Sequence, residues 1–440
     1  MATTSSQPLV RRLGLFDATM LVMGGIVGSG IFINPYVVAQ RVHTPALVLG
    51  AWLAGGAIAL AGAFIWAELA DRLPRVGGQY AYLREAWSPL VAFLYGWVLL
   101  LVIQTGGMAA VTVTFARYFL ELTGLRATDW EIGIFTLSVL TLVNCLGVRA
   151  GSATQSILMV IKIVVIGALV LAGAFFIRGP EVAWRPLLGR PASPSLLAAF
   201  GAAMVPVVFA YGGWQTGGFV AGEMKQPRRD LPRAFVLGVG AVAVLYLSVN
   251  YVYVRALGVS TLAVSGTPAS AVMRLALGQK GATLIALGIA VSTLGFLSQS
   301  VLTAPRVYFA MAEDGVFFRQ LAWIQPRTHV PVIAIVIQSV WTIVIMLSGS
   351  YERILNYVTS MDAIFWTFTA GCLFILRRRE TTSTTFRVPG HPFTTGCFCL
   401  ACAGVAGNAI YNDPWKTLIG MVILAAGIPV YYIWRAVSRA

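Results

Sequence analysis

Long apolar runs separated by short polar connections recur along the whole chain. A helix needs roughly 20 predominantly apolar residues to cross a bilayer. Runs of this length predict an all-α polytopic membrane protein with twelve transmembrane helices. The predicted spans cover residues 14–41, 45–71, 88–121, 129–147, 152–177, 195–222, 232–256, 281–311, 331–348, 354–376, 394–411 and 416–436.

Short glycine-rich segments interrupt the first and the sixth of these runs, at 24–32 and 209–218. A helix that ends inside a bilayer leaves N–H and C=O groups unpaired, which is tolerated only where they line a cavity or bind a ligand. Paired broken helices in corresponding halves of a chain point to the substrate site of a transporter. The pattern therefore predicts that spans one and six are broken helices.

The spans that follow the two interruptions come in the same order: a broken helix, an ordinary helix, a very long helix and two ordinary ones. Because five is an odd number, the second set enters the membrane with the opposite orientation, which gives a five-plus-five inverted repeat. The predicted division is an N-terminal tail at 1–13, repeats at 14–178 and 195–378, two further spans at 394–436 and a C-terminal end at 437–440.

The composition supports a membrane protein, because 58% of the residues are hydrophobic and only 11% are charged, against about 25% charged in soluble domains. The net charge of +15 lies in short loops, where membrane lipid and orientation explain it better than a nucleic-acid partner. Lysine and arginine are more frequent on the cytoplasmic side when both termini are placed there, so we expect cytoplasmic termini.

Residues that support catalysis or metal binding are sparse. Three of the five cysteines crowd residues 397–402 without a neighbouring histidine, and we interpret them as buried thiols. The histidines lie in predicted loops, at His43, His329 and His391. We therefore expect no catalytic residue, no metal site and no cofactor, which makes an intramembrane enzyme a poor alternative.

The first interruption offers groups for both ends of an α-amino acid. Gly28 and Gly30 allow a ligand to approach the backbone closely, and Ser29 adds a hydroxyl group. The half-helix that starts there presents free N–H groups and a positive dipole end, which suit a carboxylate. The preceding half-helix ends in carbonyls near Ile26 and Val27, which suit an ammonium group. The competing interpretation is Gly-x-x-x-Gly helix packing.

The second interruption would complete that site. Carbonyls near Phe209 and Ala210 would add to the ammonium site, and Phe209 and Trp214 would wall a bound side chain. The competing interpretation places these aromatic residues at the membrane interface or against lipid. The predicted substrate-binding residues are Ile26, Val27, Gly28, Ser29, Gly30, Ile31, Phe209, Ala210, Gly212, Gly213, Trp214 and Gln215.

Lys162 lies near the middle of its predicted span, about 15 Å from the inner end at 1.5 Å per residue. An ionisable residue inside the membrane is a functional candidate by default. It would either exchange a proton during transport or stay charged and donate to carbonyls of the first break in place of a sodium ion. The competing interpretation is a fixed ion pair with Glu68.

Charged residues near the inner ends of spans two, six and eight indicate ion pairs that close an inner gate or serve a structural role: Glu68, Glu223, Arg306, Glu313 and Asp314. Asp362 in span ten has no obvious partner. No acidic residue occurs at either break, which favours a neutral substrate, although spans three, eight and ten also line pockets of this kind. Short amphipathic helices are expected at 79–85, 268–277 and 313–323.

Six segments carry a family resemblance: Gly-Ser-Gly-Ile-Phe at 28–32, Phe-Ala-Tyr-Gly-Gly-Trp at 209–214, and 68–70, 77–82, 223–232 and 305–315. With them the chain resembles the amino acid–polyamine–organocation (APC) superfamily, and most closely the bacterial L-type amino acid transporter (LAT) branch. The resemblance implies the LeuT-type fold of five plus five inverted spans and transport by alternating access.

The resemblance also assigns roles within the site. Ser29 and Gly30 would bind the substrate carboxylate, and the carbonyls of Ile26 and Phe209 would bind its amino group. Phe209 would form an outer gate. A lysine at the position of Lys162 is associated with sodium independence.

Two departures from the family pattern bear on specificity and partners. Gln215 stands where this branch often carries asparagine. The loop 122–128 lacks the cysteine with which animal members bind a heavy chain. We therefore expect no disulfide-linked partner and a monomer or weak homodimer, which fits a protein of the bacterial inner (plasma) membrane.

These features favour a sodium-independent transporter of neutral L-amino acids that works by exchange. A proton-coupled symporter is the first alternative. A transporter of polyamine- or ethanolamine-like amines is the second, although such a ligand would leave the N–H groups of the first break unpaired. A channel would not need two broken helices arranged to clamp an amino acid.

Overall fold

The protein is predominantly helical, and a computed structural model describes residues 11–177, 187–188, 193–348, 351–379, 384–412 and 414–437. Within these residues the only β-type pairing is an isolated bridge between Leu13 and Met224. The α-helices are α1 Leu15–Ile26, α2 Gly30–Val42, α3 Pro45–Arg72, α4 Gln79–Ala86, α5 Pro89–Val98, α6 Gln104–Thr123, α7 Asp129–Cys145, α8 Val148–Phe175, α9 Pro194–Tyr211, α10 Pro227–Leu262, α11 Pro268–Thr303, α12 Pro305–Glu313, α13 Val332–Leu347, α14 Tyr351–Arg379, α15 Phe393–Asn412 and α16 Pro414–Val437.

Three short helices of other types complete the chain: a π-helix η1 at Leu99–Ile103 and 3₁₀ helices η2 at Trp214–Glu223 and η3 at Arg319–Ala322. The π-helix joins α5 to α6, so the predicted long third span is one helix. Seven helices of the described chain are long and apolar enough to cross a membrane, and the bent pair α1 and α2 makes an eighth. This establishes a multi-pass helical protein, whereas twelve spans, the inverted repeat and the domain boundaries stay predictions.

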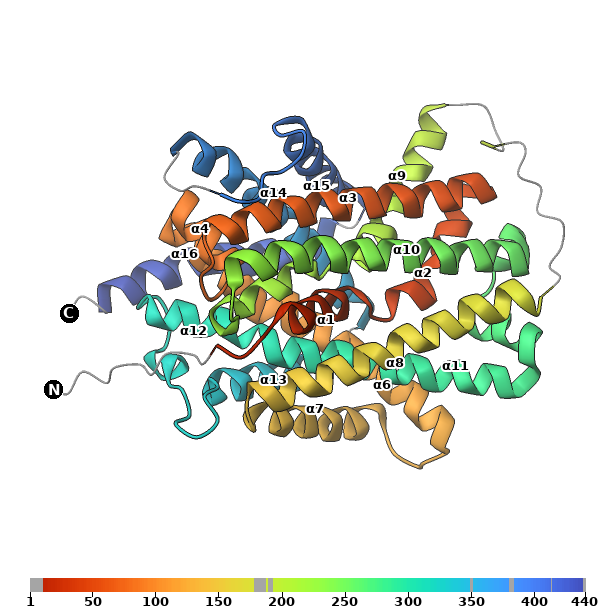
Figure 1. Cartoon of the computed structure of the whole chain (residues 1–440), viewed down its shortest axis with the longest axis horizontal. Helices are drawn as coiled ribbons and strands as arrows, with labels where there is room; N and C mark the ends of the chain where they lie inside the picture. Colours follow the sequence, from red (N-terminus) through yellow and green to blue (C-terminus); the bar gives the residue numbers. More distant parts are fainter. Residues whose placement is uncertain are drawn as a thin grey trace.

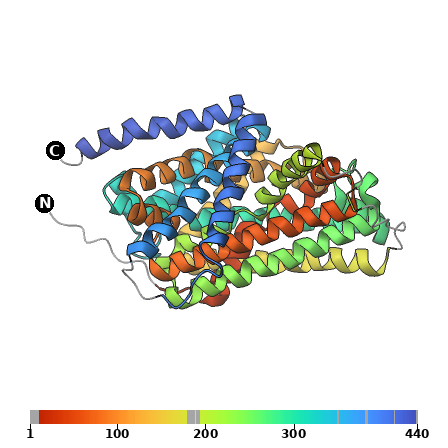
Figure 2. The same cartoon turned by 90° about the horizontal axis from the view of Figure 1, so that it is seen from above.

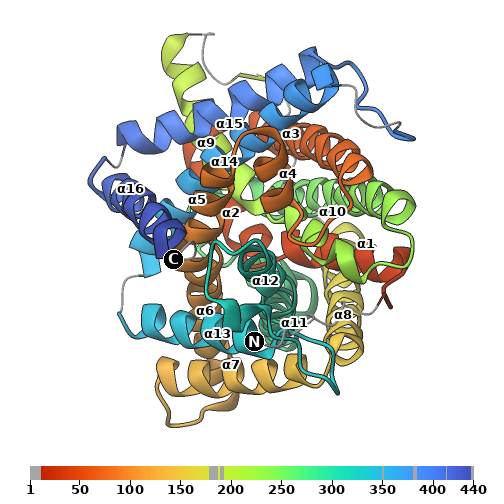
Figure 3. The ribbon, with the colours of Figure 1, turned by 90° about the vertical axis from the view of Figure 1, so that its left-hand side faces the viewer.

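Helices α3, α10, α8 and α11 run along the long axis of the molecule, and the start of α1 and the end of α16 lie at the same end (Figure 1). We call it the terminal end. Helix α10 packs along α3, and α11 packs along α8. Seen from the terminal end, α1 lies beside α10 (Figure 3). The last helix, α16, runs along the outer edge of the bundle (Figure 2).

Both predicted interruptions break their helices. Helices α1 and α2 meet at 41° across residues 27–29. Helix α9 ends at Tyr211, Gly213 adopts φ +105°, and the chain continues as a 3₁₀ helix. Glycine adopts positive φ without the steric cost that a side chain imposes, so the sequence at the second break permits this turn.

The short amphipathic segments had mixed outcomes. Residues 79–85 form α4, and 268–277 form the first part of α11 up to a kink at Gly278. The helix expected at 313–323 was wrong. Helix α12 ends at Glu313, Gly315 adopts φ +72°, and only η3 is helical beyond it. The predicted tails at 1–13 and 437–440 lie almost entirely outside the described residues.

Candidate functional site

The two broken helices touch each other at a pair of glycines. A Cβ atom on Gly25 would lie 2.4 Å from the Gly213 carbonyl oxygen, and one on Gly213 would lie 2.0 Å from the Gly25 carbonyl oxygen. Real Cβ atoms do not approach backbone atoms so closely. Only glycine at both positions therefore lets the two interruptions meet in this way.

Tyr246 of α10 links the ends of the two half-helices. Its hydroxyl oxygen lies 3.2 Å from the carbonyl oxygen of Ile26 and 3.3 Å from that of Ala210. The hydroxyl group has one proton to donate, while each carbonyl oxygen has two lone pairs. Both carbonyls therefore keep capacity to accept a further hydrogen bond.

The start of α2, which lines the same cavity, offers unpaired donors. Among the described residues, no group accepts a hydrogen bond from the backbone amides of Gly28, Ser29 or Gly30. The first N–H groups of a helix have no partner within the helix, and they carry the positive end of its dipole. Together with the carbonyls of the preceding half-helices, they provide separate places for an anionic and a cationic group.

A cavity of about 100 Å³ lies at these groups. Part of its lining comes from α6, α11 and α14, which lie in predicted spans three, eight and ten and contain none of the predicted substrate-binding residues. Several of those side chains are polar, including Gln104, Gln299 and Asp362. The predicted residues in the lining are Ile26, Gly28, Ser29, Gly30, Phe209, Ala210, Gly212, Gly213 and Gln215.

Three predicted site residues do not line this cavity: Val27, Ile31 and Trp214. The Trp214 side chain is 1% exposed, and its ring centroid lies 6.0 Å from that of Trp66 and 4.6 Å from that of Trp366. Trp366 of α14 is the tryptophan of the cavity lining. The expectation that Trp214 itself walls the substrate is therefore corrected, because its ring is packed between helices.

Lys162 reaches the first break from α8. Its side chain is completely buried, and its Nζ donates to the carbonyl oxygen of Val27 at 2.5 Å. Glu68 pairs instead with Arg72 and Arg377, so the alternative of a Lys162–Glu68 ion pair is wrong. The contact places Lys162 at the first break, while proton exchange and replacement of a sodium ion both stay predictions for it.

Asp362 changes the argument about the substrate. The preference for a neutral substrate used the absence of an acidic residue at the two breaks, but Asp362 of α14 lines the same cavity. The sequence signal was a carboxylate in an apolar run without an obvious partner. Its place in the cavity could not be predicted, because it depends on how α14 packs against α6.

Comparison with known proteins identifies the family. Residues 13–428 match the family model described as amino acid permease, which is nearly the whole chain. The chain belongs to the amino acid permease family. It is therefore an amino acid transporter of the APC superfamily related to the LAT branch, rather than an enzyme.

Three relatives show how this permease compares with characterised transporters. It is 31% identical to the serine/threonine exchanger SteT of Bacillus subtilis, over 98% of each chain. It is 28% identical to the human large neutral amino acids transporter small subunit 2, over 97% of this chain and 80% of the relative. It is 27% identical to the human cystine/glutamate transporter, over 97% of this chain and 85% of the relative.

At the terminal end of the permease, an ion pair lies beneath the cavity. Arg306 and Glu223 are both buried, and the Nη2 of Arg306 donates to the Oε1 of Glu223 at 2.9 Å. Arg306 also donates to the Leu302 carbonyl, and the backbone amide of Arg12 donates to the Glu223 carbonyl at 2.8 Å. The predicted ion pair therefore forms, and it holds η2, α12 and the segment before α1 together.

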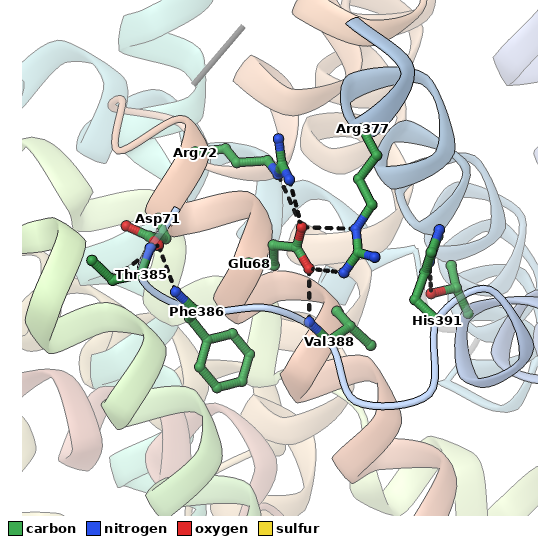
Figure 4. A network of polar contacts seen from close by, with 9 residues as sticks. Glu68, Asp71, Arg72, Arg377, Thr385, Phe386, Val388 and His391 are labelled. Carbon is green, nitrogen blue, oxygen red and sulfur yellow. Dashed lines mark hydrogen bonds and ion pairs between the residues drawn. The ribbon is translucent and has the colours of Figure 1, made fainter. Parts of the chain in front are cut away.

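A second network fastens α14 to α3 (Figure 4). The two carboxylate oxygens of Glu68 accept from Arg72, from Arg377 at 2.6 Å, and from the backbone amide of Val388 at 2.7 Å. One turn along α3, Asp71 accepts from the backbone amides of residues 385 and 386. The chain after α14 is thereby held against the terminal end of α3.

Asp314 forms a third contact at this end. Its carboxylate accepts from the Tyr80 hydroxyl at 2.8 Å and pairs with Arg84 at 2.6 Å. Burial raises the pKa of Asp314, and the Tyr80 and Arg84 contacts oppose that rise. These three networks join separate elements of the permease at its terminal end, and whether they close an inner gate stays a prediction.

We expect Glu223→Ala to lower the free energy of unfolding by about 3–5 kcal/mol, because it leaves the buried guanidinium of Arg306 without its partner. Asp129→Ala is the control, since it removes the half-exposed partner of Arg117, and an exposed pair contributes about 0–1 kcal/mol. Unfolding of both variants in detergent micelles, followed against wild type, checks this. Equal losses in the two variants would contradict a special contribution from the buried pair.

Proposed function

We propose that this protein is a sodium-independent exchanger of neutral L-amino acids that works by alternating access. The observation that carries the proposal is the unpaired amides of Gly28, Ser29 and Gly30, which share one cavity with the carbonyls of Ile26 and Ala210. An α-amino acid has a carboxylate and an ammonium group on one carbon atom. A cavity lined by both free donors and free acceptors suits both groups at once.

The related transporters support exchange as the mode of transport. The Bacillus subtilis relative is by name a serine/threonine exchanger, and two of the human relatives are by name transporters of large neutral amino acids and of cystine and glutamate. Exchange of one amino acid for another is thus our first expectation. Proton-coupled symport stays the alternative, with Lys162 as the group that would carry the proton.

A neutral substrate and sodium independence have separate physical support. The cavity of about 100 Å³ is smaller than the engineered cavity of about 150 Å³ that admits benzene, so a long cationic side chain fits poorly. The ammonium group of Lys162 already donates to the Val27 carbonyl. A positive charge held at the end of α1 would remove one reason for the site to bind sodium.

We further propose a twelve-span inverted-repeat architecture in the inner membrane of a bacterium, with both termini in the cytoplasm. In that orientation the three networks of the terminal end form the closed cytoplasmic side. We propose a monomer or weak homodimer without a disulfide-linked heavy chain, because the loop 122–128 contains no cysteine.

The test is uptake of radiolabelled alanine by proteoliposomes in sodium-free buffer. Vesicles with and without internal unlabelled alanine are compared, each with and without an inward proton gradient, and protein-free liposomes are the control. We expect uptake to depend on internal amino acid and not on the gradient.

Other outcomes of this experiment select the alternatives. Uptake into empty vesicles that follows the proton gradient would replace exchange with proton symport. A stimulation by added sodium would contradict sodium independence. If no amino acid is taken up while labelled putrescine or ethanolamine is, the amine transporter replaces the proposal.

A further inference from the structure

We propose that the carboxyl group of Asp362 accepts a hydrogen bond from the substrate side chain. It would thereby select short side chains that carry a hydroxyl group. This inference rests on the proposed function, because it assigns the side-chain end of the same cavity. The residue lies on α14, between Val358 and Trp366, which also line the cavity. It is thus about one helical turn from a lining residue on each side.

Within the described part of the protein, Asp362 has electrostatic interactions with Tyr95 of α5 and Cys402 of α15, but it forms no hydrogen bond or ion pair. The ion pairs there involve other carboxylates, and no described group donates a hydrogen bond to it. The buried Lys162 is bound to Val27 instead. A carboxyl group in a largely apolar cavity is costly unless something hydrogen-bonds to it. A bound substrate would supply that donor.

The groups that suit the two charged ends of an amino acid come from other elements. The free amides belong to the start of α2, and the available carbonyls end α1 and α9. Asp362 comes from α14, which packs against α6, and residues Gln104 and Gly107 of α6 also line the cavity. The substrate side chain would therefore extend toward the α6 and α14 wall.

The size and charge of the cavity limit which substrate side chains it can accept. A space of about 100 Å³ favours serine- or threonine-like side chains over long ones. An acidic side chain would bring a second carboxylate next to Asp362, and like charges repel. A hydroxyl group is short, and it donates one hydrogen bond to a carboxyl oxygen. Asp362 therefore favours a hydroxyl group over a methyl group of the same size.

Threonine and valine are the matched probes, because they differ only by a hydroxyl in place of a methyl group. A hydrogen bond to a charged group contributes about 1.5–3 kcal/mol, which corresponds to roughly 10- to 150-fold. We expect unlabelled threonine to inhibit alanine exchange by wild-type proteoliposomes at least about tenfold more strongly than valine.

The variant Asp362→Leu replaces the carboxyl group with an apolar side chain of similar shape, and we expect it to bring the threonine-to-valine ratio close to one or to invert it. Asp362→Asn keeps an acceptor oxygen and should retain part of the preference. Asp129→Leu is the matched control, because Asp129 lies at the exposed start of α7, outside the cavity lining, and its ratio should equal that of wild type.

The outcomes separate this inference from the proposed function. If wild type exchanges no amino acid, the proposed function fails. If wild type exchanges alanine but is inhibited equally by threonine and valine, or most strongly by lysine, the assignment of Asp362 is overturned. An unchanged ratio in Asp362→Leu overturns it as well. If that variant is inactive, thermal stabilisation of wild type and Asp362→Asn by threonine and by valine decides instead.

Discussion

Gly25→Ala should reduce exchange about 100-fold, the cost of moving reacting or binding groups by about 1 Å. The added methyl group would lie 2.4 Å from the Gly213 carbonyl oxygen and 2.7 Å from the Thr216 hydroxyl oxygen. The backbone segments at the two breaks must then move away from each other. Helix propensity alone predicts no loss, because alanine stabilises the interior of a helix by about 1 kcal/mol relative to glycine.

Gly167→Ala is the matched control for this variant. Gly167 lies inside α8 and outside the cavity lining, and a Cβ atom there meets no other atom within 4 Å. Initial rates of exchange in proteoliposomes, together with size-exclusion profiles of both variants, provide the measurement. A well-folded Gly25→Ala protein with the exchange rate of wild type would show that the two breaks need not touch.

Gly30→Val tests the same contact region at the start of α2. A Cβ atom on Gly30 would lie 3.1 Å from both the Cα and the Cβ of Ala210, which is tighter than ordinary contact, and valine adds two more carbon atoms. We expect a folded but inactive protein. This variant still tests the site if Gly25→Ala fails to fold. Normal uptake by Gly30→Val would show that the first break does not bind the substrate.

The positions of the breaks could be predicted from the sequence, because their cause is local. Glycine clusters at 24–30 and 212–218 interrupt apolar runs, and the structure breaks its helices at both places. The free amides near Ser29 follow from the same local rule, since every helix start leaves N–H groups unpaired. The burial of Lys162 could be anticipated too, because charged residues rarely face lipid.

The walls of the cavity depend on tertiary packing, so spans three, eight and ten could be named as its walls but their lining residues could not. Gln104, Gln299 and Asp362 approach the site from helices far apart in the chain. Trp214 shows the reverse error. It adjoins the second break in the sequence, but its ring packs against Trp66 and Trp366 rather than lining the cavity. Trp214 is predicted in the site because it adjoins the break in the sequence. The turn at Gly213 and the packing of α14 instead direct its ring between helices.

Lys162→Ala is the second variant for which we expect a large loss, at least about tenfold in exchange rate. Lys162 donates to the Val27 carbonyl at the end of α1, and its Cε lies 2.5 Å from where a Cβ on Gly295 would stand. Truncation removes this donor and opens a space beside the break. A buried acceptor left without its partner costs about 1–3 kcal/mol, which would disturb the conformation of the first break.

Sodium provides the sharper readout for this variant. If the ammonium group of Lys162 takes the place of a bound cation, added sodium should raise exchange by Lys162→Ala while leaving wild type unchanged. The measurement is initial exchange rate with sodium or with choline as the external cation, repeated at several pH values. A variant that keeps wild-type rates and wild-type pH dependence in both buffers would assign Lys162 a structural role only. Lost exchange that no cation restores, together with an altered pH dependence, would favour proton transfer through Lys162 over replacement of a cation.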